Sequence, residues 1–294
     1  MTDLETLRKI KKLTISALVA DDILMGILVL KGGNALDLAY DITNRGSIDI
    51  DFSIEKDFSE KEKQGLLNQI SYLLSKEFSK EDLVVFDIHF SDRPHTINDA
   101  VKSFWGGYLL EFKVISKSKH DSFNGDLDSI RRNALPIHSD SSPKFTVDIS
   151  KYEYIANKRA KDIEGSVVYV YSPEMLALEK LRALCQQIPN YKEIVFSMTS
   201  KSRARDFYDI YNIAESFSAD FKSEENVELC KHIFEAKRVP LNYINLLKDQ
   251  REFHRQGWES VINTVNPKEK LKNFDFYFDY VITLFDHLSY IPFG

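Results

Sequence analysis

The feature of this sequence that most limits its fold is the stretch LVLKGGNALDLAYDITNRGSIDIDF, residues 28–52. An apolar run ends in Gly32 and Gly33, a short segment with helical spacing follows, and a second run carries Asp49 and Asp51. This order predicts a strand, a tight turn, a brief helix and a second strand. Neither the glycine pair nor the aspartate pair is needed for stability alone, which points to a ligand.

The two aspartates are paired by strand geometry. Side chains alternate across a strand, so Asp49 and Asp51 project from one face while Ile48, Ile50 and Phe52 point to the other. Two close carboxylates repel unless a cation lies between them, and Mg²⁺ with oxygen ligands is the natural candidate. Two such ions would bridge the phosphates of a nucleotide and activate an attacking oxygen. The alternative is an edge strand whose aspartates only face water.

The glycine turn favours the ligand. Glycine lets the backbone approach a phosphate closely, and the helix that follows offers free N–H groups and a positive dipole end. We therefore expect Gly32 and Gly33 to bind the phosphates of the same nucleotide.

A two-metal site commonly needs a third acid. Asp148 in FTVDIS is the first candidate, because it lies mid-strand between apolar neighbours, where an unpaired charge would be costly. Glu111 in LLEFKV is the substitute.

The first half of the chain predicts a mixture of helices and strands. Helices are expected over residues 4–18 and behind a capping box of Ser59 and Glu62. The runs that predict strands are 27–31, 47–54, 83–90, 107–115, 144–150 and 167–171.

The second half predicts helices only, over segments 172–187, 202–217, 226–236 and 273–291. In the last segment one apolar stripe is typical of a core face, formed by Phe274, Phe278, Val281, Phe285 and Leu288. The chain of 294 residues is long enough for two domains. We predict an α+β domain with a mixed sheet and flanking helices over residues 1–165, followed by a helical domain over 166–294, with the catalytic cleft between them.

Composition excludes several classes of protein. A net charge of −6 argues against strong binding of nucleic acid over the whole surface, although local basic patches such as KSRAR remain candidates. Cys185 and Cys230 lack metal-ligand spacing and are expected to be buried thiols. No signal peptide and no membrane span is predicted, so we expect a cytoplasmic protein.

Four motifs together resemble one family. KGGNAL, RGSIDIDF, SPEMLALEKLRAL and RARDFYDI occur in the expected order and span roughly two-thirds of the chain. They resemble the AbiEii/AbiGii nucleotidyltransferase toxins, which belong to the DNA polymerase β-like nucleotidyltransferase superfamily. The resemblance implies that superfamily's fold for the first domain.

The resemblance also implies roles for individual residues. It assigns Asp49 and Asp51 to metal binding, and Gly33 and Asn34 to the triphosphate. Asn34 stands where the family more often has Ser or Thr, and its amide can still donate to a phosphate oxygen. Arg45 and Ser47 either contact substrate or cap and pair locally.

In the second half the resemblance assigns Lys180 to a nucleotide phosphate and marks Asp206 and Asp209 as active-site acids. The two aspartates share a helix face, and Arg205 can pair with Asp209. The alternative for the aspartates is a structural ion-pair network, and for Lys180 a pair with a nearby acid on the helix surface.

The expected reaction is metal-dependent transfer of a nucleoside monophosphate from an NTP to an acceptor hydroxyl, with Mg²⁺, as one or two ions, or Mn²⁺ in its place. The resemblance implies a toxin of a toxin–antitoxin or phage-defence system, with a cognate antitoxin and with an RNA end such as tRNA, or a protein side chain, as acceptor. The alternative is a non-catalytic nucleotide- or RNA-binding module that keeps the fold.

Overall fold

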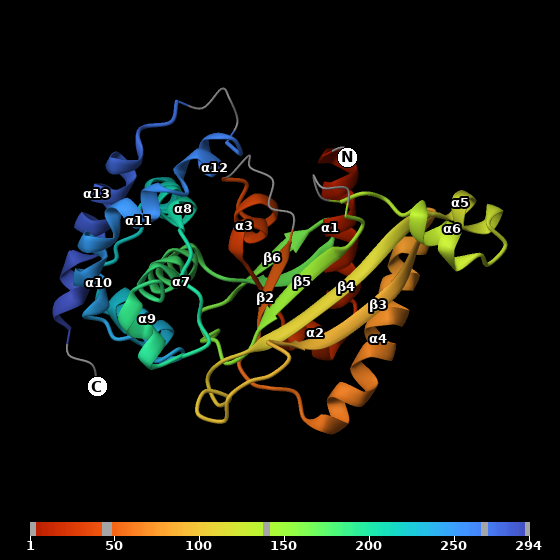
Figure 1. Ribbon diagram of the computed structural model, residues 1–294, viewed down its shortest axis with the longest axis horizontal. Coiled ribbons are helices and arrows are strands. Elements are labelled where there is room, and N and C mark those ends of the chain that lie inside the picture. The colour runs from red at the N-terminus through yellow and green to blue at the C-terminus, as the bar shows by residue number, and fades with distance from the viewer. Residues whose placement is uncertain (1–3, 43–48, 138–141, 266–269, 292–294) are drawn as a thin grey trace.

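Strand β2 (Ile50–Ser53) lies in the middle of a mixed sheet (Figure 1). The computed structural model describes residues 4–42, 49–137, 142–265 and 270–291. Within these residues seven strands form one sheet in the order β3-β4-β5-β2-β1-β7-β6. The other strands are β1 (Val29–Lys31), β3 (Leu83–Arg93), β4 (Gly107–Ser116), β5 (Phe145–Ser150), β6 (Arg159–Ile163) and β7 (Ser166–Val170).

The sheet is mixed because β2 runs antiparallel to β1 and parallel to β5, and β1 runs parallel to β7. The remaining neighbours are antiparallel. A central strand has hydrogen-bonded neighbours along both of its edges. Asp51 of the D-x-D motif is therefore not on an exposed edge strand.

Some helices of the first half pack on the sheet, and two short ones lie beyond one end of it. Ser59 and Glu62 form the predicted capping box at the start of α4, whose buried residues follow the predicted helical spacing. In Figure 1, α5 and α6 lie beyond the end of β3 and β4. The bounds are α1 (Leu4–Val19), α2 (Asp22–Ile27), α3 (Gly32–Asn34), the π-helix η1 (Ala35–Ala39), α4 (Glu60–Ser79), α5 (Lys117–Ser122) and α6 (Leu127–Arg132).

The second half is helical and gathers on one side of the sheet (Figure 1). Its longer helices are α7 (Pro173–Cys185), α8 (Ala204–Phe217), α9 (Glu224–Glu235) and α13 (Phe274–Phe285). The short ones are η2 (Pro189–Glu193), α10 (Tyr243–Leu246), η3 (Leu247–Gln250), α11 (Arg251–Arg255), α12 (Trp258–Ile262) and η4 (Asp286–Tyr290). The predicted apolar stripe is confirmed, because all five of its side chains are buried. One hydrophobic core cluster includes residues of both halves.

Two local predictions were wrong. Ile27 was expected in the first strand but ends α2, because Asp21 caps a helical turn there with its side chain. Strand β6 was not predicted, since the mostly exposed sequence RAKDI lacks an apolar face.

The predicted domain boundary, between residues 165 and 166, falls in the turn of the β6–β7 hairpin. Strand β7 is part of the sheet, and the change from strands to helices comes at Ser172, the N-cap of α7. The division into two domains stays a prediction.

No helix in the described ranges combines the length and the apolar character that crossing a bilayer requires. Cys185 and Cys230 are both buried free thiols, as expected.

Candidate active site

Asp51 and Asp148 lie next to each other on parallel strands. The register of β2 and β5 pairs Asp51 directly with Asp148. Their flanking residues Ile50, Phe52 and Val147 are fully buried on the other face, as strand alternation requires. The fold thus brings together two carboxylates that are 97 residues apart in the sequence.

The glycine turn packs directly against this pair. Gly32 has a φ of +67°, and a Cβ atom built there would come within 2.5 Å of Asp51 Oδ2. Only glycine satisfies both the backbone conformation and this close approach. The absence of a side chain at Gly32 therefore leaves the space that the Asp51 carboxylate occupies.

Asp49 directly precedes β2 rather than lying within it. Its carboxylate accepts a hydrogen bond from the Thr146 hydroxyl on β5, and its backbone carbonyl accepts one from the fully buried Asn34 side chain. Asn34 thus joins the glycine turn to the carboxylate strand. Arg45 and Ser47 lie outside the described residues.

The surroundings of the pair disfavour negative charge. Burial raises the pKa of Asp51 to about 7; Lys31 opposes this effect, and Asp148, Glu179 and Asp49 add to it. Burial also raises the pKa of Asp148, although its ion pair with Arg93 acts in the opposite direction. A further cation at this place would relieve the repulsion.

The donor chemistry fits a hard divalent cation. Across the described ranges, no three His, Cys, Asp or Glu side chains gather closely enough to form a complete metal site. Mg²⁺, however, is usually held by one or two carboxylates together with substrate phosphates. The adjacent Asp51 and Asp148 carboxylates supply that kind of partial site.

The other candidate for the third acid lies further along the sheet. Glu111 on β4 is in register with Thr146 and forms an ion pair with Lys144 at 3.0 Å. Asp148, not Glu111, is the acid beside Asp51.

Lys180, Asp206 and Asp209 form a cluster of their own between α7 and α8. The Lys180 ammonium lies 3.2 Å from Asp206 and 2.7 Å from Asp209, and all three residues are buried. Arg203 also pairs with Asp206, and the two cations hold the pKa of Asp206 below its usual value despite its burial. Whether these three predicted site residues act in catalysis stays a prediction.

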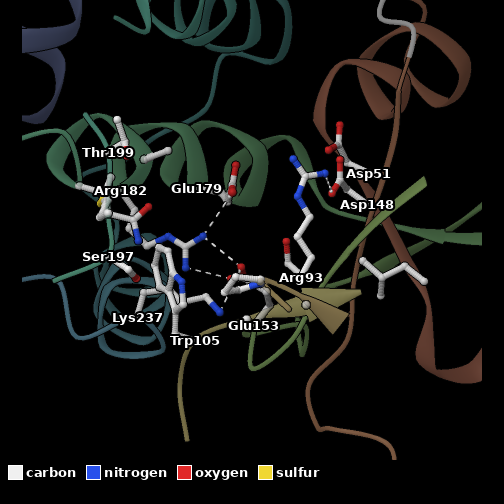
Figure 2. Close-up of a pocket in the computed structure, with 18 of the residues that line it drawn as sticks. Asp51, Arg93, Trp105, Asp148, Glu153, Glu179, Arg182, Ser197, Thr199 and Lys237 are labelled. Atoms are coloured by element: carbon white, nitrogen blue, oxygen red, sulfur yellow. Dashed lines mark hydrogen bonds and ion pairs between the residues drawn. The ribbon is translucent and has the colours of Figure 1, made fainter. Parts of the chain in front are cut away.

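A cavity of about 740 Å³ lies between the sheet and the helices (Figure 2). Asp51, Asp148 and Arg93 line it on the sheet side, and Arg203 lines it on the helical side. The Lys180 cluster does not line this cavity as far as the described residues show, and Arg203 connects the two. The cavity lies between the strand-rich and helical parts, and its identity with the predicted catalytic cleft stays a prediction.

A buried ion network forms part of the cavity wall. Glu153 pairs with Arg182 at 2.9 Å, Lys237 at 3.5 Å and Lys31 at 3.6 Å, and Glu179 pairs with Lys31 and Arg182. Burial lowers the pKa of Lys31, but Glu153 and Glu179 more than offset this and raise it overall. The network joins β1, the segment after β5, α7 and the segment after α9.

These cavity residues were not predicted as site residues. Lys31 precedes the glycine pair, and Glu179 and Arg182 lie in the segment SPEMLALEKLRAL, so these three had a local signal. Arg93, Glu153 and Lys237 belong to segments with no motif, and only the tertiary fold brings them to the cavity.

A family model described as the nucleotidyl transferase AbiEii toxin of a type IV toxin–antitoxin system matches residues 16–280. No curated protein sequence matches the chain.

Two solved structures resemble it distantly. A crystal structure of a candidate nucleotidyltransferase from H. pylori has 14% identity and a TM-score of 0.49, covering 98% of this chain and 96% of that one. An antigenic nucleotidyltransferase-like protein from Paracoccidioides brasiliensis has 14% identity and a TM-score of 0.33, covering 87% and 94%.

Proposed function

The chain belongs to the AbiEii family of nucleotidyl transferase toxins, and from this premise we propose that it moves a nucleoside monophosphate from an NTP to an acceptor hydroxyl. The observation that carries the proposal is the Asp51–Asp148 pair, in register on parallel strands, beside Gly32 and open to the cavity.

Asp51 and Asp148, with Asp49 nearby, would hold Mg²⁺, as one or two ions, or Mn²⁺ in its place. The metal would neutralise charge on the phosphates and orient the reacting oxygens. Thr146 and Asn34 hold Asp49 in position from β5 and from the glycine turn.

In the proposed reaction the acceptor oxygen forms a bond to the α-phosphorus, and the bond from that phosphorus to pyrophosphate breaks. The hydroxyl proton passes to Asp148, which lies beside Asp51 and faces the cavity. Gly33 and Asn34 near the triphosphate complete the proposed set, together with Lys180, whose cluster with Asp206 and Asp209 connects to the cavity through Arg203.

The family supports a toxin that acts with a cognate antitoxin. We extend the proposal to a cytoplasmic phage-defence role, with an RNA end such as tRNA, or a protein side chain, as acceptor.

Incubation with labelled NTPs, Mg²⁺, total RNA and total protein tests the proposal. Label transfer should vanish in Asp51→Asn and Asp148→Asn and persist in Glu111→Gln, which changes an acid on the same sheet that is not beside Asp51. Label on RNA or on protein identifies the acceptor. NTP binding without transfer to either acceptor would overturn the enzyme and indicate a binding module.

A further inference from the structure

Arg93, the last residue of β3, reaches across the sheet to Asp148. Its Nη1 lies 2.6 Å from Asp148 Oδ1, although β3 and β5 are separated by β4. The residue of β4 in register with Arg93 is Gly107, and the one in register with Asp148 is Leu109, so the arginine reaches diagonally over β4. Figure 2 shows the guanidinium beside the carboxylates of Asp148 and Asp51.

This contact is suited to exchange. The Arg93 side chain is 57% exposed, while that of Asp148 is 32% exposed. Ion pairs exposed to this degree contribute little net stability. Among the described residues the only hydrogen bond from this guanidinium is through Nη1, so most of its donors remain available. Arg93 can therefore leave Asp148 at small cost.

The guanidinium and a divalent cation would compete for the same carboxylate. A metal ion held by Asp51 and Asp148 requires the Asp148 carboxylate, and it would repel a guanidinium 2.6 Å from Oδ1. The displaced side chain stays in the cavity, because Arg93, Pro94 and Thr96 all line it. An arginine fork binds phosphate oxygens through two parallel hydrogen bonds.

We propose that Arg93 is a nucleotide-binding residue that exchanges Asp148 for phosphate. When the metal and the NTP bind, the guanidinium leaves the carboxylate and pairs with the phosphates of the nucleotide. Arg93 thus keeps the third acid paired until the substrate is present. This inference rests on the proposed function, because it requires a metal at Asp51 and Asp148.

The exchange predicts two effects of opposite sign in Arg93→Gln. Without nucleotide, Mn²⁺ should bind more tightly, by roughly threefold or more, because a competing cation is gone. The Mn²⁺ complex of a non-hydrolysable NTP analogue should bind more weakly, by about tenfold, because a charge-assisted contact is lost. Electron paramagnetic resonance of free Mn²⁺ measures the first effect, and calorimetry the second.

Two variants control the experiment. Arg131→Gln removes another exposed arginine that pairs with an aspartate, Asp87 at 2.8 Å, and should change neither affinity. Arg93→Lys keeps the charge but loses the fork, so it should leave Mn²⁺ affinity near wild type and weaken only the analogue. Circular dichroism and thermal unfolding verify that each variant is folded.

The outcomes separate this inference from the proposed function. Unchanged Mn²⁺ affinity in Arg93→Gln, or a loss of both affinities together, overturns the exchange, while Mn²⁺ binding and label transfer by the wild type still support the enzyme. Wild-type protein that binds no Mn²⁺ in a manner dependent on Asp51 overturns both.

Discussion

At the scale of single residues, the site depends on a contact that the sequence indicated only indirectly. The glycine turn and the D-x-D strand were both predicted to serve a phosphate ligand. The structure adds that Gly32 also supports Asp51 directly, since its missing side chain leaves room for the carboxylate. The turn is thus part of the carboxylate site as well as a candidate phosphate site.

Gly32→Ala should therefore damage activity more than stability. The new Cβ would lie 2.5 Å from Asp51 Oδ2 at a φ of +67°. A left-handed alanine costs about 1–2 kcal/mol, while a carboxylate displaced by about 1 Å can lower the rate roughly 100-fold. The labelled-NTP assay and urea unfolding measure the two effects.

Gly65→Ala is the matched control, because it makes the same chemical change inside α4 with no atom within 4 Å of the new methyl group. It should leave activity unchanged and raise stability by about 0.5–1 kcal/mol. Wild-type activity in Gly32→Ala would contradict the proposed support of Asp51.

At the scale of helices and strands, long periodic segments were predictable and short ones were not. The capping box at Ser59 and the aromatic stripe after Asn273 were confirmed because each signal is local and repeated. Strand β6 was missed because its pairing with β7, not an apolar pattern, makes it a strand. The position of Asp49 just outside β2 was missed as well, because it depends on tertiary hydrogen bonds with Thr146 and Asn34.

The junction of the sheet with α7 depends on Glu153. This side chain is 5% exposed and is surrounded by Lys31, Arg182 and Lys237. Burial raises the pKa of Glu153, but the three cations more than offset that effect and hold it well below its usual range. Glu153→Gln should cost about 3–5 kcal/mol, because it leaves buried cations without their shared partner.

Urea unfolding measures this cost. Glu228→Gln, which removes an exposed partner of Lys231 on α9, should leave the midpoint unchanged. An equal midpoint for the two variants would show that the network contributes nothing at the junction.

The packing of α11 on the start of α8 should be sensitive to acid. His254 Nδ1 accepts a hydrogen bond from the Arg203 backbone N–H at 3.1 Å, and its side chain is fully buried. Burial lowers the His254 pKa from 6.5 to about 4; Asp206 opposes this shift and Arg203 adds to it. As the pH falls, the His254 ring is therefore protonated in the unfolded chain before it is protonated in the folded protein. The stability that neutral His254 contributes above pH 6.5 is lost as the pH falls towards 4.

Linkage puts this loss at about 3 kcal/mol. His254→Asn has no titrating ring, and its amide oxygen can accept the same N–H, so its stability curve between pH 6.5 and 4 should differ from that of the wild type by the missing His254 contribution. Chemical denaturation across that range measures both proteins. Parallel curves would exclude His254 as the source.

At the scale of the whole molecule, the meeting of the carboxylates was predictable but most of the side chains around their cavity were not. Asp51 and Asp148 lie in strands with clear patterns, so their meeting followed from the expected sheet. Arg93, Glu153 and Lys237 reach the cavity only through strand order and helix packing. A single sequence holds no signal for contacts of that range when the residues lie outside a recognised motif.

The same packing predicts that the chain unfolds as one unit rather than as two domains. One hydrophobic core cluster spans both halves, and the Glu153 network ties β1 to α7 across their junction. The two tryptophans report on different places in the molecule, because Trp105 lies on the cavity wall with its ring centroid 6.2 Å from that of Tyr191, and Trp258 lies in α12 against Phe274. Trp258→Phe leaves only the fluorescence of Trp105, and Trp105→Phe leaves only that of Trp258.

In each variant the midpoints of urea unfolding measured by fluorescence and by far-ultraviolet circular dichroism should coincide, as a single cooperative transition requires. Separate midpoints would instead favour two domains that divide near residue 165.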